Sequence, residues 1–424
     1  MSILSKNAFY LPAVGCRICK STIELIHNLG TLSSSGTFPS TRAEIVPEGP
    51  LEIGRCVSCG LVQLKHDFNK SILYSDSYGY RSGLQESMVT HLQGIADSAS
   101  KRIKTSFPEK SSDSTFVDIG SNDATLLKQM KKIHGDHGRY LGVDPSAEKY
   151  SELYRDSGIE LFAELFDSHT AKNRLGAISA DVVTSIAMFY DLEDPVDFAL
   201  AVSEILNENG IWILEQSYLP DMILNNAFDT ICHEHLEYYS LTDISNICER
   251  AGLRVFDVEM NNSNGGSFRT FVCHQGNELY PTTPIVNEIL FKEESELSID
   301  NELGEFFVKI SDIKRQTLAE LRGLATSGKI VHGYGASTKG NTLLQYFGID
   351  ESLMPFIAER NPDKYGKFTP GTKIPIISES ESRDMKPDYY FVLPWHFRES
   401  ILARESQFSD SRRFIFPLPV FEIV

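Results

Sequence analysis

Short apolar segments alternate with amphipathic ones in the middle of the chain. Residues 115–119 have the pattern of a buried strand that ends in a turn at Gly120, and Leu126, Leu127 and Met130 then repeat on one face of a helix. Further strands are predicted at residues 140–143, 181–187 and 211–215, with helices between them. This alternation is typical of a doubly wound α/β sheet.

The pattern changes after residue 240. A predicted helix begins at Thr242, which we expect to cap it, and Gly252 ends it. Its apolar positions have helical spacing: Ile244, Ile247, Cys248 and Ala251. Two strands follow, at 254–258 and 268–273, and the Asn/Gly-rich segment 261–266 between them favours an antiparallel hairpin.

A second strand–glycine–helix unit lies near the end of the chain. The acidic stretch 291–301 and the long helical pattern 302–327 lead to a strand that ends at Gly335. We therefore expect three domains: residues 1–75, 76–280 and 281–424. The glycine turns near Gly120 and Gly335 favour two nucleotide-type sites on one chain.

Composition excludes several classes of partner. The chain has 424 residues and a formal net charge of −18, whereas proteins that bind nucleic-acid backbones use clustered Lys and Arg. No apolar run approaches the roughly 18 residues of a membrane helix. The first ten residues lack the pattern of a secretory signal. We expect a cytoplasmic protein with neither a nucleic-acid partner nor a membrane partner.

Four of the seven cysteines form two pairs with the same spacing, Cys16 with Cys19 and Cys56 with Cys59. Two C-x-x-C turns at the ends of a short segment are typical of a tetrahedral zinc site. The alternatives are a thioredoxin-like redox pair, which needs only one such turn, and four unconnected thiols. Four protein ligands leave no open position on the metal, so this zinc would be structural.

The turn after the first strand lies where open α/β sheets bind ligands. Gly120 lets the backbone approach a ligand closely, and Asp144 stands where ribose hydroxyls would be held. The fingerprint G-x-G-x-x-G is absent, which disfavours a nicotinamide site. The pattern D-x-G-x-N, from Asp118 to Asn122, is closer to the S-adenosylmethionine turn of class I methyltransferases, and the antiparallel hairpin fits their sheet. The alternative is an ordinary strand–helix turn with a packing glycine.

The segment 232–239, Cys-His-Glu-His-Leu-Glu-Tyr-Tyr, concentrates titratable side chains. Its spacing is not H-E-x-x-H, which disfavours a zinc-protease site. A histidine base oriented by a carboxylate fits better, because imidazole titrates near neutral pH. A hydrogen-bonded surface loop is the alternative. The tyrosine-rich strip 74–82 is interpreted first as a linker packed on both neighbouring domains.

These motifs in this order resemble the nucleotide-sugar C-methyltransferases, whose known members act on 4-keto deoxysugars. The resemblance rests on the four-cysteine module, the segment 118–123, the His-Glu-His-Leu-x-Tyr-Tyr cluster and, in the last domain, the segments 333–340 and 361–364. It implies a zinc-binding module, a central class I methyltransferase domain and a C-terminal Rossmann-like α/β domain.

The resemblance also implies residue roles. S-adenosylmethionine would lie across Asp118, Gly120, Asn122 and Asp144. His235 would be the base, with Glu234 beside it and either Tyr78 or Tyr80 as the active-site tyrosine. The nucleotide sugar would lie between the last two domains, on Tyr334, Lys339, Asn341, Glu359, Arg360 and Asn361.

Four positions depart from the family's usual residues. Cys232 stands where a tyrosine is frequent, Met188 lies near a position that is often histidine, Asn264 replaces the histidine of the hairpin, and Ala124 replaces the third glycine of the cofactor turn. These departures leave open the sugar configuration and the groups that steady the intermediate.

The resemblance implies methylation at C-3′ of a nucleotide-linked 4-keto-6-deoxyhexose through an enolate, because carbon becomes nucleophilic when a proton beside a carbonyl is removed. The alternatives are O- or N-methylation of a sugar or other small metabolite and a zinc-ribbon binding module. The sequence does not distinguish dTDP from GDP substrates. We expect a monomer or a weak oligomer.

Overall fold

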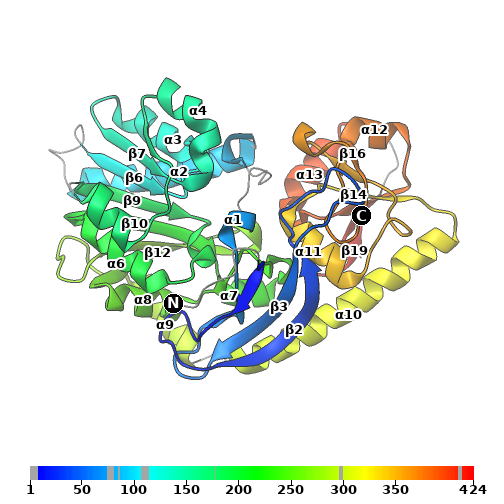
Figure 1. The fold of residues 1–424 in the computed structure, drawn as a ribbon, viewed down its shortest axis with the longest axis horizontal. Coiled ribbons are helices and arrows are strands. Elements are labelled where there is room, and N and C mark those ends of the chain that lie inside the picture. Colours follow the sequence, from blue (N-terminus) through cyan, green and yellow to red (C-terminus); the bar gives the residue numbers. More distant parts are fainter. Residues whose placement is uncertain are drawn as a thin grey trace.

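The computed structural model describes residues 8–73, 81–84, 86–106, 114–176, 178–295, 299–408 and 413–424. Within them, two α/β lobes lie side by side, and a curved hairpin from the N-terminal module runs beneath both (Figure 1). No described helix combines the length and the apolar composition that a membrane span needs.

The central lobe is built on a seven-stranded sheet. Its strands, in spatial order, are β8 (Glu160–Phe162), β7 (Arg139–Val143), β6 (Thr115–Ile119), β9 (Ala180–Ile186), β10 (Leu206–Ser217), β13 (Ser267–His274) and β12 (Leu253–Asn261). Strands β6 to β10 are parallel, whereas β13 runs antiparallel to both neighbours. The predicted doubly wound sheet with an antiparallel last strand is thus confirmed.

Helices cover this sheet on both faces, because its central parallel strands are buried and mostly apolar. The main ones are α2 (Glu86–Ser106), α3 (Thr125–His134), α4 (Ser151–Asp156), α6 (Pro195–Ile205) and α8 (Leu241–Arg250). Shorter segments are α5 (Ser168–Thr170) and α7 (Leu219–Leu224).

The predicted cap of α8 is wrong. Ser240 caps the helix, because its hydroxyl accepts from the Asp243 amide while the Asp243 carboxylate accepts from the Ser240 amide, forming a reciprocal capping box. The Thr242 hydroxyl instead donates to Glu293 Oε2 at 2.6 Å.

The N-terminal module contains two small sheets and the short helix α1 (Lys70–Leu73). Strand β1 (Tyr10–Pro12) pairs with β5 (His66–Phe68), and the second sheet has the order β11 (Glu237–Tyr238), β4 (Val62–Leu64), β3 (Glu48–Cys56), β2 (Ile23–Ser33). Strand β11 comes from the central part of the chain. The N-terminal module therefore shares a sheet with the segment that contains His235.

The C-terminal lobe repeats the doubly wound plan. Its sheet has the order β16 (Ile376–Ser378), β15 (Ile357–Glu359), β14 (Val331–Tyr334), β17 (Tyr389–Val392), β18 (Arg413–Phe416), β19 (Glu422–Ile423). Its helices are α11 (Thr338–Phe347), α12 (Glu379–Asp384) and α13 (Arg398–Glu405), and the connection from the central lobe is made by α9 (Pro284–Ser295) and α10 (Ile299–Thr326).

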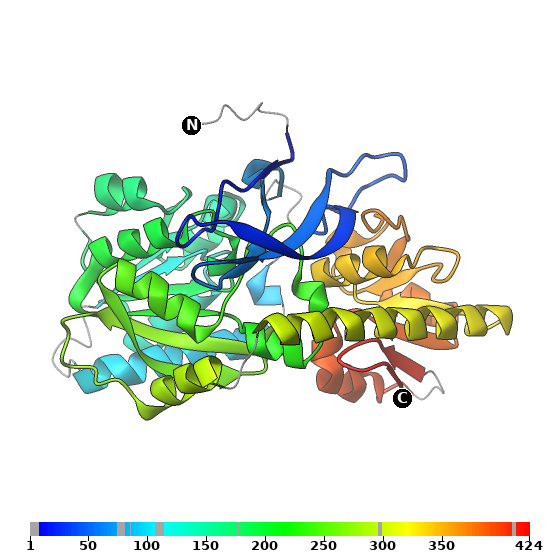
Figure 2. The ribbon, with the colours of Figure 1, turned by 90° about the horizontal axis from the view of Figure 1, so that it is seen from below.

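The hairpin β2–β3 and its loop fasten the two lobes together (Figure 2). Gln345 of α11 exchanges two hydrogen bonds with the backbone of Ser33, and Asn341 donates to the Ser35 carbonyl at 2.8 Å. The ring of Phe228, in the segment after α7, stacks on Phe347 with centroids 5.3 Å apart. These contacts place residues 228–240 between the lobes.

Candidate active site between the two lobes

The four predicted metal ligands converge. The sulfur atoms of Cys16, Cys19, Cys56 and Cys59 all lie within 4.8 Å of one another. The closest pairs are Cys16 with Cys59 at 3.4 Å and Cys19 with Cys56 at 3.3 Å, whereas a tetrahedral zinc–thiolate site with Zn–S near 2.3 Å requires about 3.8 Å. The hydrogen bond between Cys59 and Cys16 lowers the pKa of Cys16 to about 5 and raises the pKa of Cys59. The donor set fits a structural zinc ion.

The predicted cofactor turn has the conformation that its residues require. Gly120 has φ of +77° and its amide donates to the Val143 carbonyl at 2.9 Å. A Cβ at Gly120 would lie 2.8 Å from Met188 Cγ, so only glycine fits there. The Asn122 amide donates to Asp144 Oδ2 at 2.8 Å. The turn is thus held by a carboxylate from the next strand.

Asp118 lies beneath this turn and does not face solvent. Its side chain is 4% exposed and accepts a hydrogen bond of 2.6 Å from the Thr184 hydroxyl of the neighbouring strand. Burial raises the pKa of Asp118 to about 7, opposed by the Thr184 hydrogen bond and reinforced by Asp144. Ala124, which begins α3, adopts φ of +63°, a left-handed conformation that favours glycine.

His235 is oriented by a backbone carbonyl. Its Nδ1 lies 2.8 Å from the Thr230 oxygen, and the ring packs on Tyr190 with centroids 4.3 Å apart. Because a carbonyl can only accept, Nδ1 carries the proton and Nε2 keeps its lone pair. Burial and the nearby Lys339 cation lower the pKa of His235 to about 3, so the imidazole is neutral at neutral pH.

Glu234 points toward the N-terminal module. The Ser35 hydroxyl donates to its Oε2 at 3.1 Å, and a Cβ at Gly36 would lie 2.7 Å from Oε1. Burial raises the pKa of the Glu234 carboxyl. The group that orients His235 is therefore the Thr230 carbonyl. Tyr78 and Tyr80 lie outside the described residues.

Lys339 brings a positive charge from the C-terminal lobe to the loop that holds His235. Its ammonium donates to the Thr230 hydroxyl at 3.2 Å and to the Asn264 carbonyl at 3.3 Å. Burial lowers the pKa of Lys339, and the neighbouring Asp229 opposes that change. The base and the cation thus share Thr230 as a partner.

Two further groups at this junction were not singled out by sequence. The Asp229 carboxylate accepts from Trp395 Nε1 at 2.9 Å, while its other oxygen has no hydrogen-bond partner among the described residues. His396 follows Trp395, and burial followed by the Lys339 charge lowers its pKa to about 3. For His396 the available signal was its position in the fold, because residues 393–397 follow β17 at the switch point of the C-terminal sheet.

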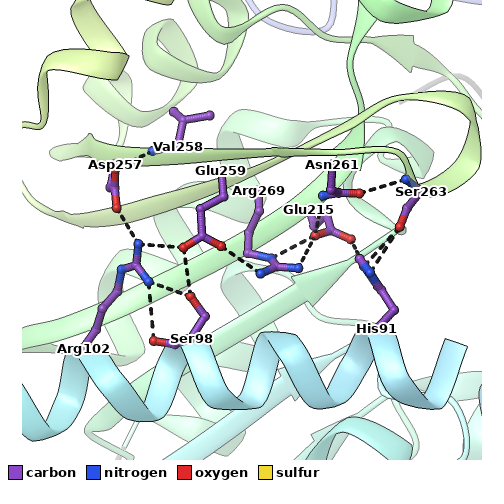
Figure 3. A network of polar contacts seen from close by, with 10 residues as sticks. All are labelled: His91, Ser98, Arg102, Glu215, Asp257, Val258, Glu259, Asn261, Ser263 and Arg269. Carbon is purple, nitrogen blue, oxygen red and sulfur yellow. Dashed lines mark hydrogen bonds and ion pairs between the residues drawn. The ribbon is translucent and has the colours of Figure 1, made fainter. Parts of the chain in front are cut away.

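A polar network fixes the hairpin that carries Asn264 (Figure 3). Glu215 of β10 accepts from Arg269 Nε at 2.9 Å, from Asn261 at 3.0 Å and from His91 of α2, and the Ser263 hydroxyl also contacts His91. Burial alone would raise the pKa of Glu215, but His91 and Arg269 lower it. The rest of the network joins Arg102 and Ser98 of α2 to Asp257 and Glu259 of β12.

The predicted substrate residues of the C-terminal lobe occupy different places. Glu359 accepts from the amides of Ala336, Arg360 and Asn361 at 2.7–2.8 Å and so joins two loops at the carboxyl edge of the sheet. Arg360 is exposed and Asn361 is half-buried beside it. Asn341 is buried against Ser35, as described above. Tyr334 lies in the core of the lobe, where its hydroxyl donates to Glu405 at 2.6 Å.

Comparisons with known proteins match every part of the chain. Residues 16–74 match the family model "Putative zinc binding domain", residues 90–258 match "Methyltransferase domain" and residues 262–419 match "C-methyltransferase C-terminal domain". Over 416 residues, 96% of each protein, the chain is 30% identical to the C-methyltransferase NovU of Streptomyces niveus. The chain belongs to the C-methyltransferase family.

Other similarities cover only part of this C-methyltransferase. A tRNA U34 carboxymethyltransferase of Campylobacter jejuni is 26% identical over 164 residues, which are 36% of this chain and 53% of that protein. An O-methyltransferase family protein from Burkholderia thailandensis has 15% identity and a TM-score of 0.36, covering 49% of this chain and 62% of that one. Likeness at this level adds nothing about substrate.

These findings confirm the enzyme class and its cofactors. The C-methyltransferase depends on S-adenosylmethionine and has a zinc-binding module with a four-cysteine cluster. The four-cysteine module is therefore one part of an enzyme, and the alternative that the whole chain is a zinc-ribbon binding module is not supported. S-adenosylmethionine supplies an electrophilic methyl group when bound, and the chain's own residues must make a carbon atom nucleophilic.

Proposed function

We propose that this enzyme methylates C-3′ of a nucleotide-linked 4-keto-6-deoxyhexose, with dTDP or GDP as the nucleotide, in the biosynthesis of branched deoxysugars. Membership of the C-methyltransferase family supports transfer to carbon. The observation that carries the proposal is the hydrogen bond from His235 Nδ1 to the Thr230 carbonyl, because it leaves Nε2 unprotonated as a base.

In the proposed reaction His235 Nε2 removes the proton on C-3′, and the C–H electron pair becomes the enolate of the C-4′ ketone. A carbonyl next to this carbon makes its proton acidic, and a positioned base contributes roughly 10²–10⁴-fold. His235 is neutral at neutral pH, so Nε2 can accept the proton, but its low pKa makes it a weak base, and stabilisation of the enolate oxygen must supply much of the driving force. The enolate carbon would then form a bond to the methyl group as the bond from that methyl to the sulfonium sulfur breaks, which would leave a neutral thioether and a protonated His235.

Lys339 is placed to stabilise the enolate oxygen. The cation that disfavours an imidazolium at His235 favours a negative charge on the substrate. Carbonyl and hydroxyl oxygens hold the ammonium directly, and Asp229 is the nearby acidic group. We therefore assign Lys339 to the reacting end of the sugar as well as to the nucleotide-sugar lobe.

The two switch points supply the remaining binding groups. Gly120, Asn122 and Asp144, with Asp118 beneath them, are proposed to bind S-adenosylmethionine at the β6–β9 switch point. Glu359, Arg360 and Asn361 are proposed to line the nucleotide end of the substrate site, at the carboxyl edge of the sheet of β14 and β15. Asn341 would act by holding the N-terminal loop. Tyr334 is left out of the proposal because its hydroxyl is engaged by Glu405.

The test is product analysis with a panel of substrates. Purified enzyme is incubated with S-adenosylmethionine and dTDP- or GDP-linked 4-keto sugars, and the product is identified by mass spectrometry and NMR. We expect a new C–CH₃ group at C-3′. A methyl group on oxygen or nitrogen would contradict the proposal and favour O- or N-methylation.

Replacement of the base tests the enolate step. His235→Asn should lower both methylation and cofactor-independent wash-in of deuterium at C-3′ by about 10²–10⁴-fold, while S-adenosylmethionine affinity stays unchanged. His332→Asn is the control, because His332 is also a buried imidazole but bonds Ser382 within the C-terminal lobe. Undiminished methylation by His235→Asn would exclude this base.

A further inference from the structure

Arg17 is a buried cation between two of the zinc ligands. It lies between Cys16 and Cys19 in the chain, and its side chain is 3% exposed. The guanidinium donates through Nη1 to the Leu64 carbonyl at 2.8 Å and through Nη2 to His66 and Asp67 at 3.0 and 2.5 Å. The first zinc turn therefore holds strand β4 and the residues that follow it.

Glu237 is the partner of Arg17 on the catalytic segment. The two side chains form a buried ion pair, with Arg17 Nε 3.4 Å from Glu237 Oε1. Neither Glu237 oxygen accepts a hydrogen bond from a described residue. Burial raises the pKa of the Glu237 carboxyl, and the Arg17 guanidinium is the strongest influence that opposes this rise and favours the charged form. Glu237 lies only two residues beyond His235.

Backbone pairing makes the same connection. Strand β11 pairs with β4, so that Glu237 faces Gln63, and the Leu64 amide donates to the Leu236 carbonyl at 2.8 Å. The Leu236 amide in turn donates to the carbonyl of Tyr190, whose ring packs on His235. The residues on the C-terminal side of His235 are thus held by the N-terminal module.

We propose that Arg17 and Glu237 are positioning residues, through which the closed zinc turn fixes the segment that carries His235. Four thiolates on one ion would fix the backbone of residues 16–19, and hence the origin of the Arg17 side chain. The zinc module then acts on the reaction without touching the substrate. This proposal rests on the proposed role of His235 as the base.

The first test separates positioning from stability. Arg17→Met and Glu237→Gln should each lower deuterium wash-in at C-3′ at least tenfold, with kcat falling more than KM rises, while S-adenosylmethionine affinity and bound zinc stay at the wild-type level. Arg254→Met is the matched control, because Arg254 also holds two backbone carbonyls, those of Asn277 and Tyr280, but lies away from the site. It should retain the wild-type wash-in rate.

The second test is independent of substrate. Hydrogen–deuterium exchange of the full chain, read by mass spectrometry, should show faster exchange over residues 232–240 in Arg17→Met and in wild-type enzyme stripped of zinc by a chelator. Restoring zinc should restore protection in the wild type, and helix α10 should be unaffected throughout. If Arg17→Met does not fold, Arg17→Lys replaces it in the experiment, because lysine keeps the positive charge but lacks the planar guanidinium.

The outcomes distinguish this proposal from the proposed function. Wild-type protection of residues 232–240 in Arg17→Met, or unchanged wash-in, would overturn the positioning role. Absence of wash-in by the wild-type enzyme would overturn the proposed function instead, and the exchange experiment would still decide whether the zinc turn holds the segment.

Discussion

The two glycine turns of this enzyme share one architecture but differ in charge. In the central lobe the Asn122 amide donates to Asp144 of the next strand, and in the C-terminal lobe the Ala336 amide donates to Glu359 of the next strand, both at 2.8 Å. Each turn lies at the switch point of a doubly wound sheet. A carboxylate from the second strand therefore shapes both sites in the same way.

The difference lies in what surrounds each carboxylate. Asp118 lies beneath the central turn and adds a second acid. At the corresponding position of the C-terminal lobe, two residues before the turn glycine, the residue is Gly333. Two half-buried lysines supply positive charge nearby instead: Lys339, at the start of α11, and Lys364, which donates to the Ala336 carbonyl at 2.7 Å. An acidic turn suits a sulfonium cofactor, whereas a turn with cations suits a pyrophosphate or an enolate. We therefore propose that local charge, and not the shared fold, distinguishes the ligands of the two turns.

Among changes at the two turns, the largest effect is expected from removing a cation near the C-terminal turn. Lys339→Met should lower kcat by about 10²–10³-fold, the usual cost of one donor to a developing oxyanion, and leave the affinity for S-adenosylmethionine unchanged. Lys364→Met is the control on the same turn and should raise KM for the nucleotide sugar with a smaller change in kcat. Steady-state kinetics and calorimetric titration check both. If both variants changed kcat and KM to the same extent, the two lysines would not have different roles.

An intermediate effect is expected from exchanging the paired carboxylates for amides. Asp144→Asn should weaken S-adenosylmethionine binding by about 10–100-fold, because hydrogen bonds to a charged group contribute about 1.5–3 kcal/mol. Glu359→Gln should raise KM for the nucleotide sugar to a similar extent and leave cofactor affinity intact. Isothermal titration with each ligand measures both. If either variant weakens both ligands equally, the two turns are not separate sites.

The sequence predicted the strands, the helices and the turn proposed for the cofactor more closely than it predicted the arrangement of the substrate site. The strand 115–119 was predicted with the bounds it has, because a buried parallel strand is a continuous apolar run between polar turns. The orientation of His235 could not be predicted, because its partner is the Thr230 backbone and carries no sequence signal. Asp229 was missed because its neighbours Trp395 and Lys339 belong to the other lobe, and His396 because it is far from Lys339 in the sequence. Tyr334 was predicted as a ligand residue, and in the structure it is buried with its hydroxyl bonded to Glu405.

A last effect, on stability and not on catalysis, follows from the acid that only the central turn has. Burial raises the pKa of Asp118 from 3.8 to about 7, so between these pH values the folded protein keeps a proton that the unfolded chain has lost. The unfolded state then binds fewer protons, and the free energy of unfolding falls as pH rises through this window. Asp118→Asn cannot ionise and keeps an oxygen for the Thr184 hydroxyl, so it should gain stability over the wild type on the order of 2–4 kcal/mol by pH 8. Thermal melts at pH 4 and pH 8 measure this difference. The two proteins should melt together at pH 4, where both side chains are neutral in the folded state. Parallel curves at all pH values would instead show that Asp118 is ionised in the folded enzyme, which would make the central turn more acidic than its counterpart by a full charge.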